Sequence, residues 1–172
     1  MTQNKKVAIL VSEDVEDLEY YVPMMRLVEE GYEVLTAAME KKTLRGKHSL
    51  EITPNALISE LKADELAAVV LPGGWAPDKL RRYKEVTGLV AEMYKQKKII
   101  ASICHGGWIP ISAGVVKGHK ATGTIAIKDD LVNAGAIWVD EPAFREGNFV
   151  WGQVVKDIPA FNRELVKALK LA

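Results

Sequence analysis

A chain of 172 residues, 48% of them hydrophobic and 27% charged, is long enough for one domain with a substantial core. Its 23 basic and 23 acidic residues cancel, which argues against nucleic acid or an anionic membrane as the main partner. No apolar run approaches the ~18 residues that a membrane-spanning helix needs. A single cysteine excludes an internal disulfide and, with no export signal recognisable at the N-terminus, predicts a cytoplasmic protein.

Strands and helices are predicted to alternate along the chain. The first helix follows the first strand, carries an apolar stripe of Leu18, Val22, Met25 and Leu27-Val28, and stops at Gly31. A hairpin is predicted over residues 43–53, and a turn at Gly147-Asn148 between two late strands. Buried strands are predicted at 7–11, 32–38, 67–71 and 98–103, late strands at 137–139 and 149–151, and further helices at 77–96, from after Gly107 to about 113, at 129–134 and at 158–169.

This alternation predicts one α/β domain, residues 1–172, with a mostly parallel sheet covered by helices on both faces. In such sheets ligands bind beyond the carboxyl ends of the strands. Three segments with unusual chemistry follow predicted strands, namely residues 13–19, 72–78 and 102–107. The sequence therefore points to a site at this edge of the sheet.

Cys104 lies at a predicted strand-to-helix turn. Small residues, Ser102 and Gly106, stand two positions before and after it, as a tight strand–nucleophile–helix turn requires. Such a turn strains the backbone and directs the thiol to a helix N-terminus, whose dipole favours a thiolate. A lone cysteine in an apolar stretch can also be a core residue. The strand-end position and the adjacent His105 favour a reactive thiol with a pKa below the ~8.5 of free cysteine.

Two neighbouring segments supply groups that a nucleophile needs. His105 follows the cysteine at once, although adjacency does not establish a hydrogen bond and a structural role stays open. The Pro72-Gly73-Gly74 loop ends a neighbouring strand, and its backbone N–H groups could stabilise an oxyanion. Trp75 is interpreted as a pocket wall or a subunit contact.

Acidic residues accompany the same strand ends. Residues 13–19 contain five carboxylates, and one of them, if buried, would be protonated and hydrogen-bond the thiolate; the pattern does not choose which. Asp78 either starts the following helix or orients a histidine. His48 and His119 lie in polar surroundings, and we expect them to be exposed and without a role.

Six segments in order resemble the ThiJ/PfpI superfamily, in its PfpI-like intracellular protease and deglycase branch. The resemblance covers nearly the whole chain and implies a flavodoxin-like three-layer sandwich. The segments are residues 15–19, 46–48, 71–78, 101–106, 127–135 and 159–163.

The resemblance also implies roles for individual residues. Cys104 would be the nucleophile, His105 its partner, and Glu16 the carboxylic acid that touches the thiol. Asp78 would orient the histidine of a neighbouring subunit in a dimer or hexamer. If so, Trp75 and Trp108 are expected to be interface residues, because large aromatic residues are enriched in such contacts.

The predicted oxyanion and substrate site consists of Gly73, Gly74 and Gly106, with the backbone of His105. The sequence contains no Walker loop, dinucleotide fingerprint or metal-ligand cluster, so neither a cofactor nor a metal is expected.

Three functional hypotheses follow. In the first, Cys104 attacks small reactive carbonyls in a glyoxalase or protein-deglycase reaction, and His105 moves the proton. In the second, the same pair forms an acyl-enzyme with a peptide, as in an intracellular peptidase. In the third, the thiol is an oxidation sensor, or part of a stress chaperone, without a substrate. The physiological substrate is not fixed by the residues.

Overall fold

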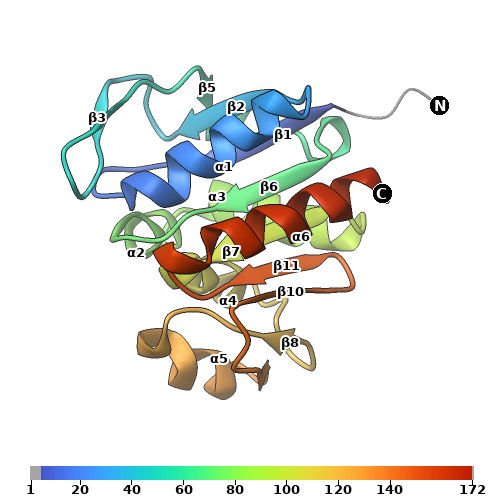
Figure 1. Ribbon diagram of the computed structural model, residues 1–172. Helices are drawn as coiled ribbons and strands as arrows, with labels where there is room; N and C mark the ends of the chain where they lie inside the picture. The colour runs from blue at the N-terminus through green and yellow to red at the C-terminus, as the bar shows by residue number, and fades with distance from the viewer. Residues whose placement is uncertain (1–4, 172) are drawn as a thin grey trace.

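The computed structural model describes residues 5–171, and its centre is a seven-stranded sheet (Figure 1). The strand order is β10-β11-β7-β6-β1-β2-β5, and all neighbouring pairs are parallel except β10 with β11. The sheet strands are β1 (Lys6–Leu10), β2 (Glu33–Ala38), β5 (Ala56–Leu57), β6 (Ala68–Leu71), β7 (Ile99–Ile103), β10 (Ala143–Glu146) and β11 (Phe149–Gly152).

Two short pairs stand outside this sheet. The strands β3 (Leu44–Arg45) and β4 (Glu51–Ile52) form an antiparallel hairpin, which confirms the hairpin predicted over residues 43–53. The strands β8 (Lys120–Ala121) and β9 (Ile137–Trp138) pair in parallel.

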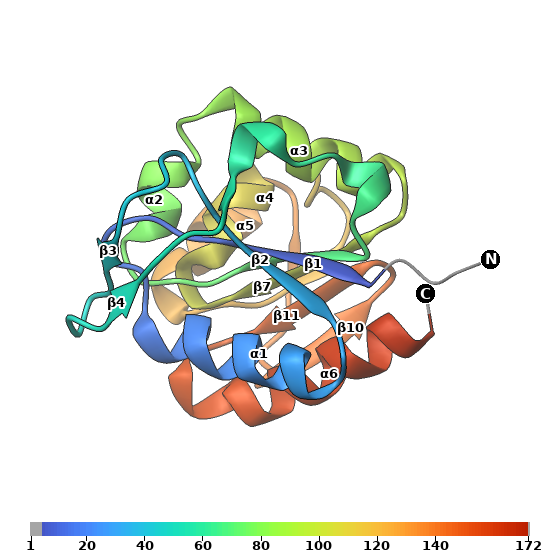
Figure 2. The same ribbon diagram turned by 90° about the horizontal axis from the view of Figure 1, so that it is seen from above.

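Helices cover both faces of the sheet, as the alternating pattern predicts. Figure 2 shows α1 and α6 on one face and α2, α3, α4 and α5 on the other. The helices are α1 (Asp17–Glu29), α2 (Ala76–Leu80), α3 (Lys84–Lys95), α4 (Trp108–Ser112), α5 (Lys128–Asn133) and α6 (Ile158–Lys170). Within residues 5–171 no helix is both long and apolar enough to cross a membrane.

The core is built on the central strands. All residues of β6, β7 and β11 are buried, as are four of the five in β1, because layers of helix exclude water from both sides. The continuous apolar runs at 7–11, 67–71 and 98–103 therefore predicted these strands correctly. The parallel arrangement brings the carboxyl ends of β1, β6 and β7 to one edge of the sheet.

Two predicted elements differ from the structure. The helix expected over residues 77–96 is interrupted at Arg81–Tyr83, because Tyr83 has an extended backbone and α3 begins after it. The Gly147-Asn148 turn joins β11 to β10, a strand that the sequence did not predict, whereas β9 pairs with β8.

The predicted core face of α1 is also wrong. Its stripe of Leu18, Val22, Met25 and Val28 is exposed, and only Leu27 of the expected set is buried. The buried face instead carries Glu19, Tyr20 and Pro23 with Leu27. A helix with two apolar stripes can bury either, and here the stripe containing Tyr20, whose hydroxyl pairs with Thr36 of β2, faces the sheet.

Candidate active site

Cys104 occupies a strained turn at the carboxyl end of β7. Its φ is +60°, in the left-handed region that side chains other than glycine rarely adopt. A 3₁₀ turn, Cys104–Gly107, leads directly into α4. The turn depends on close packing, because a Cβ on Gly106 would lie 2.0 Å from the carbonyl oxygen of Leu71. This geometry confirms the predicted strand–cysteine–helix turn and is typical of functional sites.

The thiol has one imidazole and two backbone donors around it. Its Sγ lies 3.3 Å from Nδ1 of His105. The backbone N–H groups of His105 and Gly74 lie close enough to the sulfur to lower the pKa of the thiol. An oxygen that develops on a carbonyl attacked by this sulfur would therefore meet donors already in place.

A carboxyl group also contacts the thiol, and it belongs to Glu19. The side chain of Glu19 is fully buried, accepts the N–H of Gly73 at Oε2 over 2.7 Å, and lies close enough to Cys104 to raise the pKa of the thiol. The expectation that Glu16 touches the thiol is thus corrected. The reason is local: α1 begins at Asp17, so Glu16 precedes the helix, whereas Glu19 lies on the buried face with Tyr20 and Pro23.

Glu16 instead helps to hold the β3–β4 loop. Its Oε1 lies 3.3 Å from Nε2 of His48, and its Oε2 lies 3.7 Å from Nζ of Lys47. Asp17 accepts the backbone N–H groups of His48 and Leu50 at 2.7 and 2.9 Å. Although ligand atoms of Glu16, Asp17 and His48 lie within 4.8 Å of one another, these partners already occupy the carboxylates. We therefore assign this cluster to loop anchoring.

The acidity of the Cys104–Glu19 pair differs from the prediction. Burial raises the pKa of Glu19 to about 7. Burial, followed by the charge of Glu19, raises the pKa of Cys104 to about 12 and outweighs the backbone donors. The expectation of a thiol more acidic than free cysteine is therefore wrong. A proton is retained by this pair near neutral pH, because two negative charges would be costly in a buried site.

His105 is available to accept that proton, because its imidazole is neutral at neutral pH. Burial, together with the positive charge of Lys47, lowers the pKa of its imidazole below the usual value of 6.5. Within the described residues its Nε2 has no hydrogen-bond partner. The imidazole packs against two indoles, and its ring centroid lies 5.9 Å from that of Trp75 and 4.9 Å from that of Trp108.

The remaining predicted site residues are only partly brought to the thiol. Gly73 lies against it, and a Cβ there would come within 2.8 Å of the Cβ of Cys104, but its N–H is already given to Glu19. Gly73 is therefore corrected from an oxyanion donor to a close-packing position. Asp78 forms an ion pair with Arg82 on the same chain. No hydrogen bond joins Asp78 to its own His105 anywhere in residues 5–171.

His119 also departs from expectation, since it is partly buried. Its Nε2 lies 2.8 Å from the hydroxyl of Tyr94, and its Nδ1 lies 2.8 Å from Oε2 of Glu146. The ring also packs against Phe149 at the start of β11. These contacts tie α3 to the β10–β11 hairpin, at the opposite end of the strands from Cys104.

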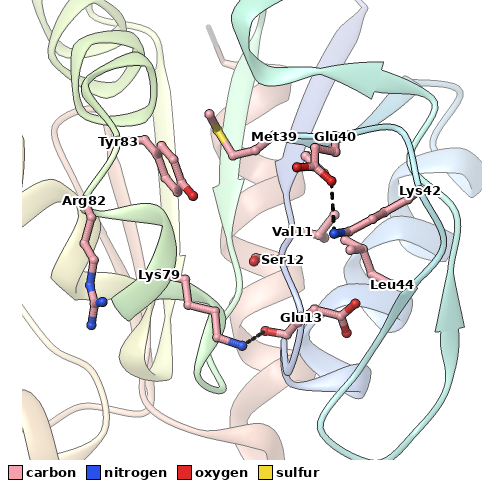
Figure 3. Close-up of a pocket in the computed structure, with 11 residues that line it drawn as sticks. Val11, Ser12, Glu13, Met39, Glu40, Lys42, Leu44, Lys79, Arg82 and Tyr83 are labelled. Atoms are coloured by element: carbon pink, nitrogen blue, oxygen red, sulfur yellow. Dashed lines mark hydrogen bonds and ion pairs between the residues drawn. The ribbon is translucent and has the colours of Figure 1, made fainter.

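A cavity of about 460 Å³ opens at the ends of β1 and β2 (Figure 3). Neither Cys104 nor His105 lines it. Its cationic side chains already have acidic partners: Lys42 lies 3.0 Å from Glu40, and Lys79 lies 2.7 Å from Asp14. Figure 3 also shows Lys79 directed at the backbone oxygen of Glu13, at 3.1 Å.

The fold and the site define an α/β protein with a strained cysteine at a strand–helix turn. The sequence pattern of the DJ-1/PfpI family matches residues 5–168, and the chain belongs to this family. It is 42% identical over 165 residues to a deglycase of Pyrococcus horikoshii, covering 96% of this chain and 99% of that protein. It is 36% identical over 169 residues to general stress protein 18 of Bacillus subtilis, covering 96% and 98%.

Solved structures show the same architecture. A two-domain protein of Anabaena variabilis, with DJ-1/ThiJ/PfpI-like and ferritin-like domains, superposes with a TM-score of 0.94 at 36% identity. The match covers 96% of this chain and 48% of that longer protein. A ThiJ/PfpI domain protein of Brachyspira murdochii has a TM-score of 0.93 at 23% identity, covering 100% and 99% of the two chains. The expected flavodoxin-like sandwich is thereby confirmed.

Proposed function

We propose that this protein is a cysteine-dependent enzyme of the glyoxalase or deglycase type, which removes small reactive carbonyl compounds in stress protection. The observation that carries the proposal is the Cys104 thiol on a strained turn, 3.3 Å from a His105 imidazole whose pKa is lowered. The relatives named deglycase and general stress protein support the same reading. With its single thiol, we place the enzyme in the cytoplasm.

The first step is addition of the thiol to the aldehyde of a 2-oxoaldehyde. The sulfur forms a bond to the carbonyl carbon while its proton passes to Nδ1 of His105, which is neutral because its pKa is low. The oxygen that gains the electron pair meets the N–H groups of Gly74 and His105. His105 then returns the proton, which leaves a neutral hemithioacetal.

The second step is an internal oxidation and reduction. A proton leaves the former aldehyde carbon and another is delivered to the adjacent carbon, while the hydroxyl proton of the hemithioacetal passes to the ketone oxygen. The former aldehyde carbon thereby becomes a thioester and its neighbour an alcohol. Water then cleaves the thioester and releases a 2-hydroxy acid and the free thiol. No external oxidant is required, because one carbon is oxidised as its neighbour is reduced.

Glu19 would control the charge of the site. With a pKa of about 7 it carries its proton in part of the population near neutral pH. In the protonated form it no longer repels negative charge on the sulfur and can donate a hydrogen bond to it. We therefore expect the protonated Glu19 form to be the active one.

We further propose that the chain assembles as a dimer or a hexamer and that Asp78 acts across the subunit boundary. Nε2 of His105 has no partner within the described part of its own chain, and Asp78 is half exposed on α2. An imidazole needs a partner to fix its tautomer and ring plane. The exposed stripe of α1, from Leu18 to Val28, supplies an apolar surface for contact between copies.

The test of function compares the wild type with Cys104→Ala. Each is assayed with methylglyoxal, with a glycated amino acid and with fluorogenic peptides, in preparations freed of other proteases. We expect loss of carbonyl turnover in the variant and no cysteine-dependent peptide cleavage by either protein. Equal carbonyl turnover by the two proteins would refute the proposal, and peptide cleavage that depends on Cys104 would replace it by the peptidase hypothesis.

The test of the shared site mixes Cys104→Ala with Asp78→Ala after subunit exchange has been verified. A mixed assembly contains some sites that combine an intact Cys104 with an intact Asp78 of the other subunit. Recovered activity above that of either variant alone is expected. If mixing restores nothing, Asp78 acts within its own chain, as a residue at the start of α2 paired with Arg82.

A further inference from the structure

Two tryptophans and the proposed catalytic histidine form one aromatic group at the entrance to the thiol. The imidazole of His105 packs at 39° to Trp75 and at 55° to Trp108. No ring contact joins Trp75 to Trp108 directly within residues 5–171. Trp75 directly follows Gly74, whose N–H points at the sulfur. Any substituent on a carbonyl bound at Cys104 would therefore be next to this group.

The two indoles differ in how firmly they are held. Trp108 donates its Nε1–H to Asp130 over 2.7 Å, and the guanidinium of Arg81 lies 5.6 Å from its ring centroid. Trp75 is anchored by its backbone, whose N–H donates to the carbonyl oxygen of Asp14 over 2.9 Å, while the residue is 53% exposed. The indole of Trp108 is thus a fixed surface, and that of Trp75 has a face left open to a ligand.

We propose that Trp75, supported by Trp108, is a specificity surface that favours carbonyl compounds with a flat, uncharged aryl substituent, such as an arylglyoxal. The inference rests on the proposed function for its substrate, but the binding surface itself does not. Aromatic rings gain from stacked or edge-to-face contacts beyond the area that they bury. An exposed indole beside a reactive group is a surface of this kind.

The surrounding charges select a neutral group over a cationic one. An indole face also attracts cations, so charge must decide between the two. The ammonium of Lys47 is close enough to lower the pKa of His105, and the guanidinium of Arg81 already covers Trp108. A cationic substituent would meet both positive charges, which Asp130 beside Trp108 and Glu16 beside Lys47 offset only in part, whereas an uncharged phenyl ring meets no such repulsion.

The test uses the alkylation of Cys104 by two matched reagents, 2-chloroacetophenone and chloroacetone. Each reacts by displacement, in which the sulfur–carbon bond forms as chloride leaves, so no enzymatic turnover is needed. The ratio of the two rate constants, measured by intact mass, is divided by the same ratio for N-acetylcysteine. This normalisation removes the intrinsic reactivity of the reagents and any effect of the thiol's pKa.

We expect the wild type to prefer the aryl reagent by about threefold to tenfold after normalisation, the range that one aromatic contact supplies. Trp75→Ala should bring the ratio close to one, and Trp75→Phe should retain most of the preference. Tyr83→Ala is the matched control, since Tyr83 is an exposed aromatic residue that lines the separate cavity. Its ratio should equal that of the wild type.

A Trp75→Ala protein that keeps the wild-type ratio overturns the proposal, whether or not its oligomeric state changes. In that case Trp75 is a subunit contact or a bystander. Turnover of phenylglyoxal and methylglyoxal is measured in parallel. If neither is consumed but the alkylation ratio holds, the proposed function fails and the aryl surface stands. If both are consumed with no aryl preference in alkylation, the function stands and the specificity surface fails.

Discussion

The surroundings of Cys104 and the cavity beside Tyr83 both lie at the carboxyl ends of the strands, yet they differ in how charge is balanced. In the cavity, Lys42 and Lys79 each have an acidic partner within 3.0 Å. At the thiol, Glu19 is fully buried, and no basic side chain of residues 5–171 is hydrogen-bonded to it. The cavity is therefore electrostatically satisfied, and the thiol site is not.

The volume of a cavity does not locate the reactive site in this fold. The cavity offers about 460 Å³, whereas Cys104 is packed so closely that a Cβ on Gly73 would lie 2.8 Å from the Cβ of Cys104 and 2.6 Å from Oε2 of Glu19. The distinguishing signs are at the thiol: a left-handed backbone, a carboxyl whose pKa is about 7, and an imidazole beside the sulfur. Groups with perturbed pKa values gather where proton transfer takes place.

The largest expected difference between the two regions comes from removing the thiol. Cys104→Ala should reduce methylglyoxal turnover by about a thousandfold or more, because covalent catalysis is lost altogether. Ser12→Ala, which removes a hydroxyl from the cavity wall, should change turnover less than twofold. A comparable loss of turnover in the two variants would contradict this difference and indicate that the cavity takes part in the reaction.

Replacement of the proposed base should have the next largest effect. His105→Gln should lower kcat/KM by about 10²-fold or more, the usual range for a general base. In the wild type, kcat/KM should fall as the pH drops through the pKa of His105, below 6.5, since a protonated imidazole cannot accept the thiol proton. This acid limb should vanish in His105→Gln. An acid limb that persists in His105→Gln would show that another group titrates there.

The strand–cysteine–helix turn at Cys104 was predictable because the residues that it requires are adjacent in the sequence. The strand run before Cys104, the small residues around it and the adjacent histidine are all adjacent in sequence, and the geometry followed. The sequence did not identify the carboxyl group beside the thiol, because Glu16 and Glu19 are only one helical turn apart. Helical spacing could have identified Glu19, because it shares the buried face of α1 with Pro23 and Leu27.

The acidity of the thiol could not be obtained from the sequence. The pattern reveals a helix after Cys104, but α4 has only five residues and follows a 3₁₀ turn. Burial and the charge of Glu19 act in the opposite direction and are larger. Both depend on residues brought together from β7, α1 and the loop after β6, so they are properties of the tertiary fold.

Glu19 should also leave a signature in stability. Its folded pKa is about 7 against 4.5 unfolded, so the folded state binds the proton more tightly. Below pH 4.5 Glu19 is protonated in both states and does not lower the free energy of unfolding. As the pH rises from 4.5 to 7, the free energy of unfolding falls by about 3 kcal/mol in total. Glu19→Gln removes this penalty and should stabilise the protein at pH 8 but hardly at pH 4.5.

Urea unfolding at the two pH values measures this effect. Glu16→Gln is the matched control, because Glu16 is paired with Lys47 and His48 and its loss should bring no gain at pH 8. A gain for Glu19→Gln that is the same at both pH values would show that packing, and not ionisation, distinguishes the variant.

The smallest effect is expected in the cavity, where Lys79→Met removes an ammonium but keeps the length of the side chain. Nζ of Lys79 lies 2.7 Å from Asp14 and 3.1 Å from the backbone oxygen of Glu13, and the side chain is partly exposed. Exposed ion pairs contribute about 1 kcal/mol or less, so unfolding should shift by no more than that. The backbone N–H of Trp75 also holds Asp14, at its carbonyl oxygen, so the loop keeps a second anchor. Turnover should change less than threefold. A loss as large as that of His105→Gln would mean that the loop after β1 transmits the state of the cavity to Gly74, and the two regions would then be one site.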